Sequence, residues 1–406
     1  MTQPDFHKTW KKQLIIVWIA QFIAANGFSF GLPFAPFFLQ KELGVPFEKL
    51  PFYISLFGAS APLMMMVFSP VWGSLADRFG RRKMLLRSYI GGAVVFALMG
   101  VAVNPAMLII LRLLQGMFCG TISAAQTLVA TQTPDEHSGV ALGSLHSAMF
   151  SGHMTGSFLG GIFAEYFGYR NAFFVTAILM SLSFFLVWQG VVEYFVPDKT
   201  KKGRLFANLI PGRKIIKPAL ALLLLMGFIS FCRQLDIAFV PLMIQNILGT
   251  ISGASGWTGA LSAVCGLAGV ISGFTLGVLS DRFPPGRIAV CSALCTASAL
   301  MAIAHSTTLT GVFVFRFIAI FVGSGIDLAL QIWLSRRTAH KDQGVVFGCA
   351  ASLRSGGMFL APLAAGAIVS AWDIKALYIA DSFFFIAAVF LILKVDRKTE
   401  VNNTTL

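Results

Sequence analysis

The sequence predicts an all-α membrane protein with twelve transmembrane helices, arranged as two related halves of six helices each. Of the 406 residues, 56% are hydrophobic and only 12% are charged, whereas soluble domains carry about 25% charged residues. Apolar runs recur along almost the whole chain, and a helix needs about 20 such residues to cross a bilayer. A charged motif that follows the second run returns after the eighth run, which indicates a duplication.

Six apolar runs make up the first half of the chain. Backbone polar groups in lipid must be hydrogen-bonded within their own segment, so each run is expected to be a helix. The alternating pattern of a membrane β-barrel is missing. The first run is too long for the core of a cleavable signal peptide and is expected to remain in the protein. The six helices are expected at residues 13–40, 52–76, 84–103, 106–131, 140–166 and 171–194.

A basic interruption separates the sixth run from the seventh. It carries many Lys and Arg residues but a single acidic one, Asp198. The chain is therefore expected to divide into an N-terminal half (residues 1–196), a basic linker (197–217) and a C-terminal half (218–406) with a short tail. The six helices of the second half are expected at residues 218–247, 256–280, 287–305, 308–334, 344–371 and 376–394.

The positive charges follow the expected membrane topology. The net charge is +14, and most Lys and Arg lie in the N-terminus, the linker, the C-terminal tail and the loops on the same side. The positive-inside rule places these segments in the cytosol, so both termini are expected there, in a multi-pass protein of the inner (cell) membrane. Nucleic-acid binding would need a basic stripe on a soluble face. The expected partner is therefore the lipid bilayer and no nucleic acid.

Equivalent residues in the two halves lie 204 or 205 positions apart. GSLADRFGRRKML after the second run is matched by GVLSDRFPPGRIA after the eighth. Repeated halves are typical of transporters whose substrate site lies between them near the membrane midplane. The phosphate-binding motif G-x-x-x-x-G-K-[ST] is missing, so the energy is expected to come from a gradient and no cofactor is expected. The matched pairs are Gly73 and Gly277, Asp77 and Asp281, Arg78 and Arg282, Arg112 and Arg316, Gly152 and Gly357, and Gly161 and Gly366.

Several motifs resemble those of the major facilitator superfamily, and the resemblance covers nearly the whole chain. GSLADRFGRRK resembles the signature between helices two and three, LRLLQG resembles the fourth-helix signature, and GLPFAPFF resembles bacterial drug:proton antiporters. The resemblance implies the major facilitator fold and a secondary active transporter, not an enzyme. It also implies export of small organic molecules or drugs in exchange for protons by alternating access. GHMTGSFLGG resembles the fifth-helix antiporter motif through Gly152, Gly156, Gly160 and Gly161, with Ser157 in place of its proline.

The resemblance also implies that the motif after the second helix forms a cytosolic gating latch between the halves, made in one state and broken in the other. A carboxylate is favoured near a helix N-terminus and pairs well with guanidinium groups. The alternative is a topology signal, which would need only the cations. The expected latch residues are Gly73, Asp77, Arg78, Arg81, Gly277, Asp281 and Arg282.

Charged residues that lie inside the expected helices each cost roughly 2.5 to 3.5 kcal/mol by insertion scales. They include Arg112, Arg233, Asp236, Arg316, Asp327 and Arg354. In the family that the chain resembles, helices one, four, seven and ten line the central cavity. We expect Asp236 and Asp327, as the only central carboxylates, to bind the coupled protons, with Arg112 and Arg233 tuning them. The residues expected for proton coupling or the substrate cavity are Asn26, Arg112, Arg233, Asp236, Arg316, Asp327 and Arg354.

Simpler roles are open for some of these polar residues. Arg233 and Asp236 are three positions apart and can neutralise each other on one helix face. Asp381, near the start of the last expected helix, is interpreted as interfacial. His153 in the fifth helix is expected to hydrogen-bond between helices.

Two other functions remain open. Four intramembrane arginines outnumber the two central aspartates, which favours a transporter of an anionic metabolite such as a carboxylate siderophore. A non-transporting membrane receptor or scaffold would keep the same fold. Under the leading hypothesis the partners are a small-molecule substrate and protons, no metal is bound, and the protein is a monomer.

Overall fold

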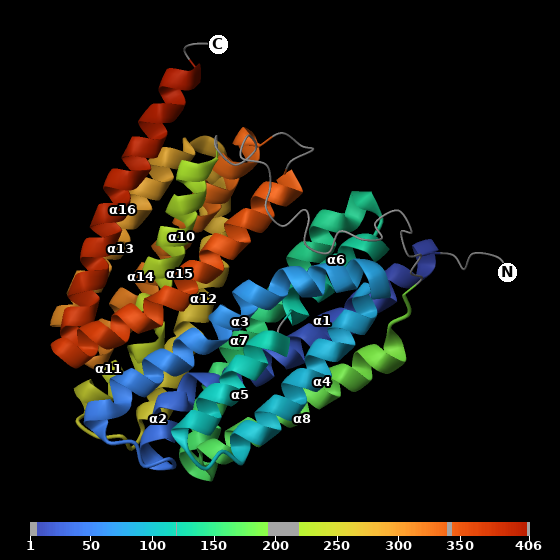
Figure 1. Ribbon diagram of the computed structural model, residues 1–406. Helices are drawn as coiled ribbons and strands as arrows, with labels where there is room; N and C mark the ends of the chain where they lie inside the picture. Colours follow the sequence, from blue (N-terminus) through green and yellow to red (C-terminus); the bar gives the residue numbers. More distant parts are fainter. Residues whose placement is uncertain (1–5, 119, 194–218, 339–342, 404–406) are drawn as a thin grey trace. The chain divides into compact units, whose positions relative to one another are not determined.

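The computed structural model describes residues 6–118, 120–193, 219–338 and 343–403, and every regular element within them is a helix (Figure 1). The expected all-α class is confirmed, whereas the proposed linker, residues 197–217, lies outside the described residues. Up to residue 193, the elements are α1 (Phe6–Gly31), η1 (Leu32–Phe34), α2 (Ala35–Lys41), η2 (Phe47–Lys49), α3 (Leu50–Phe79), α4 (Arg81–Gly100), α5 (Pro105–Phe118), α6 (Thr121–Gln132), η3 (Asp135–His137), α7 (Ser138–Phe167) and α8 (Tyr169–Gly190).

The second half of the chain continues the series of long helices. This half also contains a short 3-10 helix, η5. The elements are α10 (Leu220–Leu235), η5 (Ile237–Phe239), α11 (Val240–Leu248), α12 (Ala254–Arg282), α13 (Pro285–His305), α14 (Leu309–Arg337), α15 (Gln343–Ala371) and α16 (Ile374–Asn403).

Eleven segments in the described residues are long and apolar enough to cross a membrane. The remaining expected span coincides with α7, which has 30 residues but many Gly, Ser, Thr and His among them. A helix of that length extends for about 45 Å, more than a bilayer core requires. Each of the twelve expected helices therefore has a counterpart in the structure.

Three of the expected helices are interrupted. The first is split between α1 and α2 by η1, where Pro33 and Pro36 lack a backbone N–H. The fourth is split between α5 and α6 next to Gly120, whose φ of +127° favours glycine. The seventh is split by η5 directly after Asp236. Inside a membrane, such breaks are tolerated only where protein or a water-filled cavity meets the exposed backbone groups.

The helices pack into two units. The N-terminal unit draws on Met1–Val45, Met64–Asn208 and Ser255–Gly266, and the C-terminal unit on Pro46–Leu63, Leu209–Ala254 and Leu267–Leu406. In the first, α1 packs on α7 and α8, while α4 packs on α5, α6 and α8. In the second, α10 packs on α15 and α16, while α13 packs on α14 and α16. Each helix pair thus has its counterpart at the same place in the other half.

Glycines bring the backbones of α1 and α7 into direct contact. A Cβ atom on Gly156 would lie 2.2 Å from the Asn26 carbonyl oxygen, and Gly152 and Gly160, one turn away on either side, face α1 as closely. Helix association in lipid depends on close packing, since lipid tails are as apolar as the side chains. The glycines of the antiporter-like motif therefore hold α1 and α7 together.

The same contact recurs between α10 and α15. A Cβ atom on Gly357 would lie 2.3 Å from the Gly227 carbonyl oxygen and 2.9 Å from the Phe231 nitrogen. Each residue of this contact lies 205 positions after its counterpart in the N-terminal unit. The duplication seen in the sequence is thus preserved in backbone packing. The counterparts are Gly152, Phe22 and Asn26.

Ser157, which replaces the proline of the antiporter motif, is a buried residue of α7 that faces the first half of α12. A Cβ atom on Gly259 would lie 2.4 Å from the Ser157 carbonyl oxygen. Pro362, its counterpart 205 positions later, lies inside α15. There a Cβ atom on Gly58 of α3 would lie 2.9 Å from the Pro362 Cβ. Both residues therefore pack against a glycine of the helix that the other half of the chain contributes to the unit.

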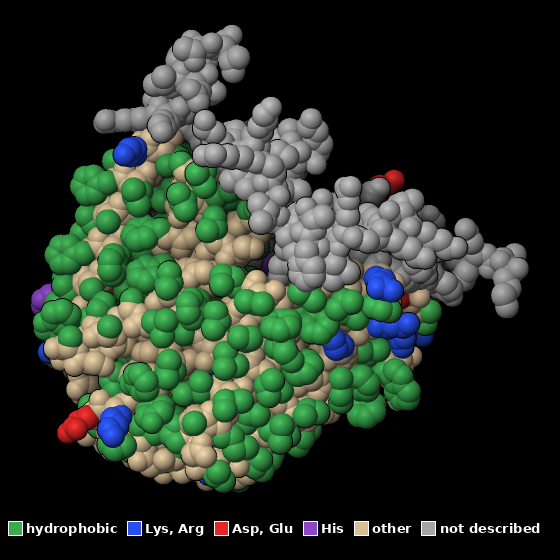
Figure 2. Space-filling model, viewed as in Figure 1, with side chains coloured by type: hydrophobic (Ala, Val, Ile, Leu, Met, Phe, Trp, Pro, Cys, Tyr) green, Lys and Arg blue, Asp and Glu red, His purple; other side chains and the backbone are tan. Residues whose placement is uncertain are grey.

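The described surface fits a bilayer. On the face drawn in Figure 2, hydrophobic side chains cover most of the helices, and the few Lys, Arg, Asp and Glu side chains lie toward the edges. Large exposed apolar residues such as Val140, Tyr166 and Phe390 would be unfavourable in water but are normal against lipid.

Gly156→Ala is expected to destabilise the protein strongly. The added methyl group would meet the backbone of α1, which can yield only if the two helices separate, and such overpacking typically costs about 1–3 kcal/mol. Gly143→Ala is the matched control on the same helix, because its Cβ would meet no atom within 4 Å. The apparent melting temperature of the purified protein in detergent measures both. Equal melting of the two variants would contradict the proposed packing role.

Candidate functional site

Asp236 lies at the break in the first long helix of the C-terminal unit. Helix α10 ends at Leu235, and the backbone turns through η5 before α11 begins. The N–H groups of Phe239 and Val240 donate to the Asp236 carbonyl oxygen at 2.9 and 3.1 Å. The backbone of the break is thereby hydrogen-bonded, and the Asp236 side chain is directed to α14.

The Asp236 carboxylate forms a two-point ion pair with Arg316 of α14. Arg316 Nη1 donates to Oδ2, and Nη2 donates to Oδ1 at 3.1 Å. Asp236 is 2% exposed and Arg316 is 6% exposed. The planar guanidinium matches both carboxylate oxygens, which fixes the geometry of the pair. Loss of one partner from such a buried pair leaves an uncompensated charge and typically costs about 3–5 kcal/mol.

A second ion pair joins the same two helices. Arg233 of α10 pairs with Asp327 of α14, and their side chains are 28% and 26% exposed. Arg233 also donates to the Gly323 carbonyl oxygen at 3.5 Å. Of the two pairs, this one is the more exposed.

In the structure, Arg233 and Asp236 do not pair with each other. Each binds a different residue of α14, and the two partners lie eleven positions apart, about three turns, on one face of that helix. Both residues face α14, and each has an oppositely charged partner on that helix.

Asp381 is buried, and its interpretation as an interfacial residue was wrong. It lies in α16 with 1% of its surface exposed. It interacts electrostatically with both Asp236 and Arg316. The expectation that Asp236 and Asp327 are the only central carboxylates is corrected accordingly. The position of Asp381 in the sequence does not show that its helix packs against α10.

The remaining expected cavity residues have other partners. In the N-terminal unit, Asn26 Nδ2 donates to Thr155 Oγ1 of α7 at 2.9 Å, and Arg112 Nη1 donates to Gln115 Oε1 of its own helix at 2.8 Å. In the C-terminal unit, Arg354 lies on α15 and is partly exposed. The structure thus brings four of the seven together as two ion pairs and gives Asn26 and Arg112 separate contacts.

Asn26 belongs to a polar strip between α1 and α7. One turn further along α1, Ser29 Oγ hydrogen-bonds His153 Nδ1 at 2.6 Å. The expected role of His153 in bonding between helices agrees with this contact.

The turn after α3 is held by a residue that the sequence did not single out. Gly80 has a φ of +95°, and the backbone N–H groups of Arg81 and Arg82 then donate to the Glu193 carboxylate at 2.9 and 2.8 Å. A carboxylate at a helix N-terminus satisfies unpaired N–H groups and the helix dipole. The only sequence signal was one acidic residue placed at the end of the sixth expected helix.

The proposed latch is only partly described. Gly73 lies on an exposed part of α3, and the Arg78 guanidinium carbon lies 5.3 Å from the Phe79 ring centroid. Four latch residues lie outside the residues whose side chains are described: Asp77, Gly277, Asp281 and Arg282. The latch therefore remains a prediction.

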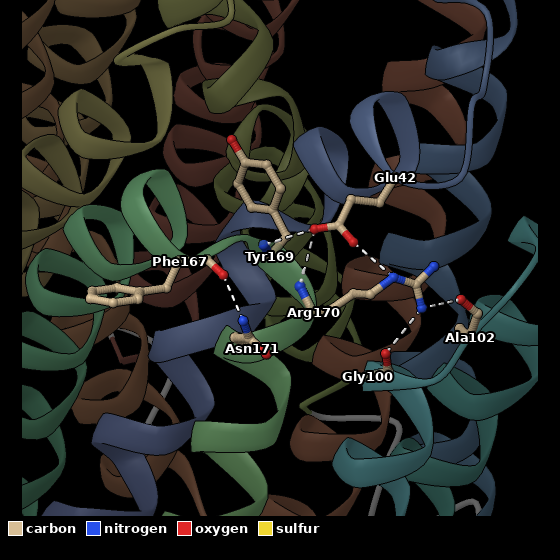
Figure 3. A network of polar contacts seen from close by, with 7 residues as sticks. All are labelled: Glu42, Gly100, Ala102, Phe167, Tyr169, Arg170 and Asn171. Atoms are coloured by element: carbon tan, nitrogen blue, oxygen red, sulfur yellow. Dashed lines mark hydrogen bonds and ion pairs between the residues drawn. The ribbon is translucent and has the colours of Figure 1, made fainter.

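A charged network ties three elements together at the start of α8 (Figure 3). Glu42 Oε1 accepts the N–H groups of Tyr169 and Arg170 at 2.9 and 3.3 Å, and Oε2 pairs with Arg170 Nε at 2.8 Å. Arg170 Nη1 donates to the carbonyl oxygens of Gly100 and Ala102. Glu42 thus caps α8 while Arg170 closes the end of α4.

The two-unit architecture and the buried charges define a membrane transporter built from duplicated six-helix halves. The chain belongs to the Major Facilitator Superfamily, whose sequence profile matches residues 17–250 and 222–406. Members of this family are transporters rather than enzymes, so the chain is a transporter.

Several known proteins are similar to this chain in sequence or in fold. The multidrug resistance protein MdtG of Salmonella heidelberg is 30% identical over 379 residues, which cover 93% of this chain and 94% of that protein. The structure of the human organic anion transporter MFSD10 has a TM-score of 0.68 and 16% identity, covering 96% of this chain and 100% of that one. The nucleoside transporter NupG has a TM-score of 0.80 and 11% identity, covering 95% and 99%. The two structures show a shared fold.

Glu42→Ala is expected to lower the free energy of unfolding by about 1–2 kcal/mol. It removes a helix cap, worth about 1 kcal/mol, and a partly exposed ion pair, worth less than about 1 kcal/mol. Glu48→Ala, at an exposed position of η2, is the control. Thermal melts of both variants in detergent measure the effect. If Glu42→Ala melts like Glu48→Ala, the network does not stabilise the fold.

Proposed function

We propose that the protein exports small organic molecules, including drugs, in exchange for protons by alternating access. The observation that carries this proposal is the two aspartates, one buried and one partly exposed, that pair with arginines across α10 and α14. Support for the substrate class comes from the similarity to a multidrug resistance protein along nearly the whole chain. The proposal includes residence in the inner membrane as a monomer, with both termini cytosolic, and a contribution to antibiotic resistance.

Ion pairs between two helices provide a mechanism for coupling. While Asp236 binds Arg316, the two charges neutralise each other. When a movement separates the helices, the carboxylate loses its partner, and binding a proton from water restores its neutrality. The more accessible pair, Asp327 with Arg233, can respond in the same way to a charged substrate. The ion pairs support a tuning role for Arg233, as expected, and for Arg316 in place of Arg112, which donates to Gln115.

The buried charges weaken the case for an anionic metabolite such as a carboxylate siderophore. That alternative depended on an excess of intramembrane arginines, but two of them, Arg233 and Arg316, are each bound to an aspartate. Flux in vesicles with and without an imposed pH gradient separates the possibilities. Proton-driven drug export supports the proposal, flux of organic anions supports the alternative, and no flux of either supports a receptor or scaffold.

Asp236→Asn is expected to reduce gradient-driven export at least tenfold while substrate exchange without a gradient persists. The amide cannot bind and release a proton, although it keeps the size of the side chain. Asp327→Asn is expected to do the same or to change which substrate charge is preferred. The measurement is drug flux in reconstituted vesicles, with exposed Asp373→Asn as the control. Normal gradient-driven export by both variants would favour an anion site formed by the arginines.

Asp77→Asn is expected to slow transport severalfold and leave expression largely intact. A latch biases the equilibrium between two conformations without contacting the substrate, so its loss changes the rate of interconversion. Lys83→Gln, which removes an exposed cation of the same motif, is the control. Transport assays and membrane expression levels are compared for the two variants. An unchanged rate for Asp77→Asn would reduce the motif to a topology signal.

A further inference from the structure

Asp381 is a buried carboxylate that the two ion pairs do not include. It is 1% exposed, and its Oδ1 atom has no hydrogen-bond partner among the described residues. Its helix, α16, packs against α10 and α13 within the C-terminal unit. An ionised carboxylate with an oxygen that accepts no hydrogen bond is disfavoured in an apolar interior.

The charges around Asp381 do not balance if every acid is ionised. Among the described residues, those that interact with it electrostatically include Asp236 at the end of α10, Arg316 of α14 and the Cys232 thiol of α10. Arg316 already donates to both oxygens of Asp236. Two carboxylates and one guanidinium would leave one negative charge in a site that is closed to water. One bound proton makes the cluster neutral.

We propose that Asp381 holds this proton and exchanges it during transport, an inference that rests on the proposed function. In the conformation seen here, Asp381 is the neutral acid and Asp236 is ionised beside Arg316. When Arg316 moves from Asp236 to Asp381, the O–H bond of Asp381 breaks and its proton passes to water. Asp236 then binds a proton from water. One proton leaves and one enters, Arg316 stays protonated, and the cluster is neutral in both states.

This arrangement gives a reason for a second aspartate within electrostatic reach of the buried pair of Asp236 and Arg316. A guanidinium with one partner would be locked in place, because separation would leave both charges unpaired in the interior. A second, neutral acid provides another position of nearly equal energy. The exchange of partners can thus be driven by the modest free energies that a substrate or a proton gradient supplies.

The test uses the full-length protein and the Asp381→Asn variant. An amide has the size and neutrality of a protonated acid, so the variant is expected to fold and melt like the wild type. Asp373→Asn is the control, since Asp373 is exposed just before the same helix and accepts the Ala376 N–H at 2.7 Å, a bond that asparagine can keep. Infrared difference spectra at neutral pH are expected to show a carboxylic-acid carbonyl band in the wild type and in Asp373→Asn that Asp381→Asn lacks.

Transport measurements supply the second half of the test. In Asp381→Asn, the flux driven by a pH gradient is expected to be at least tenfold lower than in the wild type, whereas substrate exchange is retained. An acid band that persists in Asp381→Asn, wild-type pH-driven flux in that variant, or failure of that variant to fold would each overturn the proposal. The infrared result does not depend on transport. If the wild type itself shows no response to a pH gradient, the proposed function fails, while the spectra still decide whether Asp381 is protonated.

Discussion

The absence of hydrogen-bond partners in the bilayer core constrains this whole structure. Every backbone N–H and C=O group at membrane depth must find a partner within the protein, and helices satisfy nearly all of them locally. The same environment removes the hydrophobic drive for helices to associate. Close packing takes its place, and the contact of Gly156 with the backbone of α1 shows how closely two helices approach when no side chain separates them.

The helix breaks follow from this constraint as well. Interruptions occur in the first, fourth and seventh helices, at η1, beside Gly120 and after Asp236. A break exposes backbone groups, so it is stable only where other protein groups or water meet them. At Asp236, the following residues donate to its carbonyl oxygen, and the side chain is left to bind another helix. A local backbone irregularity thus creates the position of a buried charge.

Charge balance in the C-terminal unit connects packing to transport. Arg233 and Arg316 each bind an aspartate, so the positive charges inside this unit are largely neutralised. Asp381 adds a further acid beside the more buried pair. A site of this kind is stable when neutral and sensitive to the gain or loss of one proton, which is the property that a proton-coupled transporter needs. The N-terminal unit, by contrast, joins α1 and α7 through neutral hydrogen bonds such as that of Asn26 with Thr155.

The sequence alone determined the helical class, the number and approximate limits of the helices, and the duplication, because these depend on local apolar length and on repeated motifs. It also singled out Arg233, Asp236, Arg316 and Asp327, since a charge inside an apolar run is conspicuous. Only the tertiary structure decided how they pair, that Asp381 is buried with them, and that Glu42 and Glu193 cap distant helices. Those contacts join residues roughly 80 to 130 positions apart in the chain, and they depend on which helix faces pack together and where a helix breaks. Neither is encoded in the spacing of residues along a single segment.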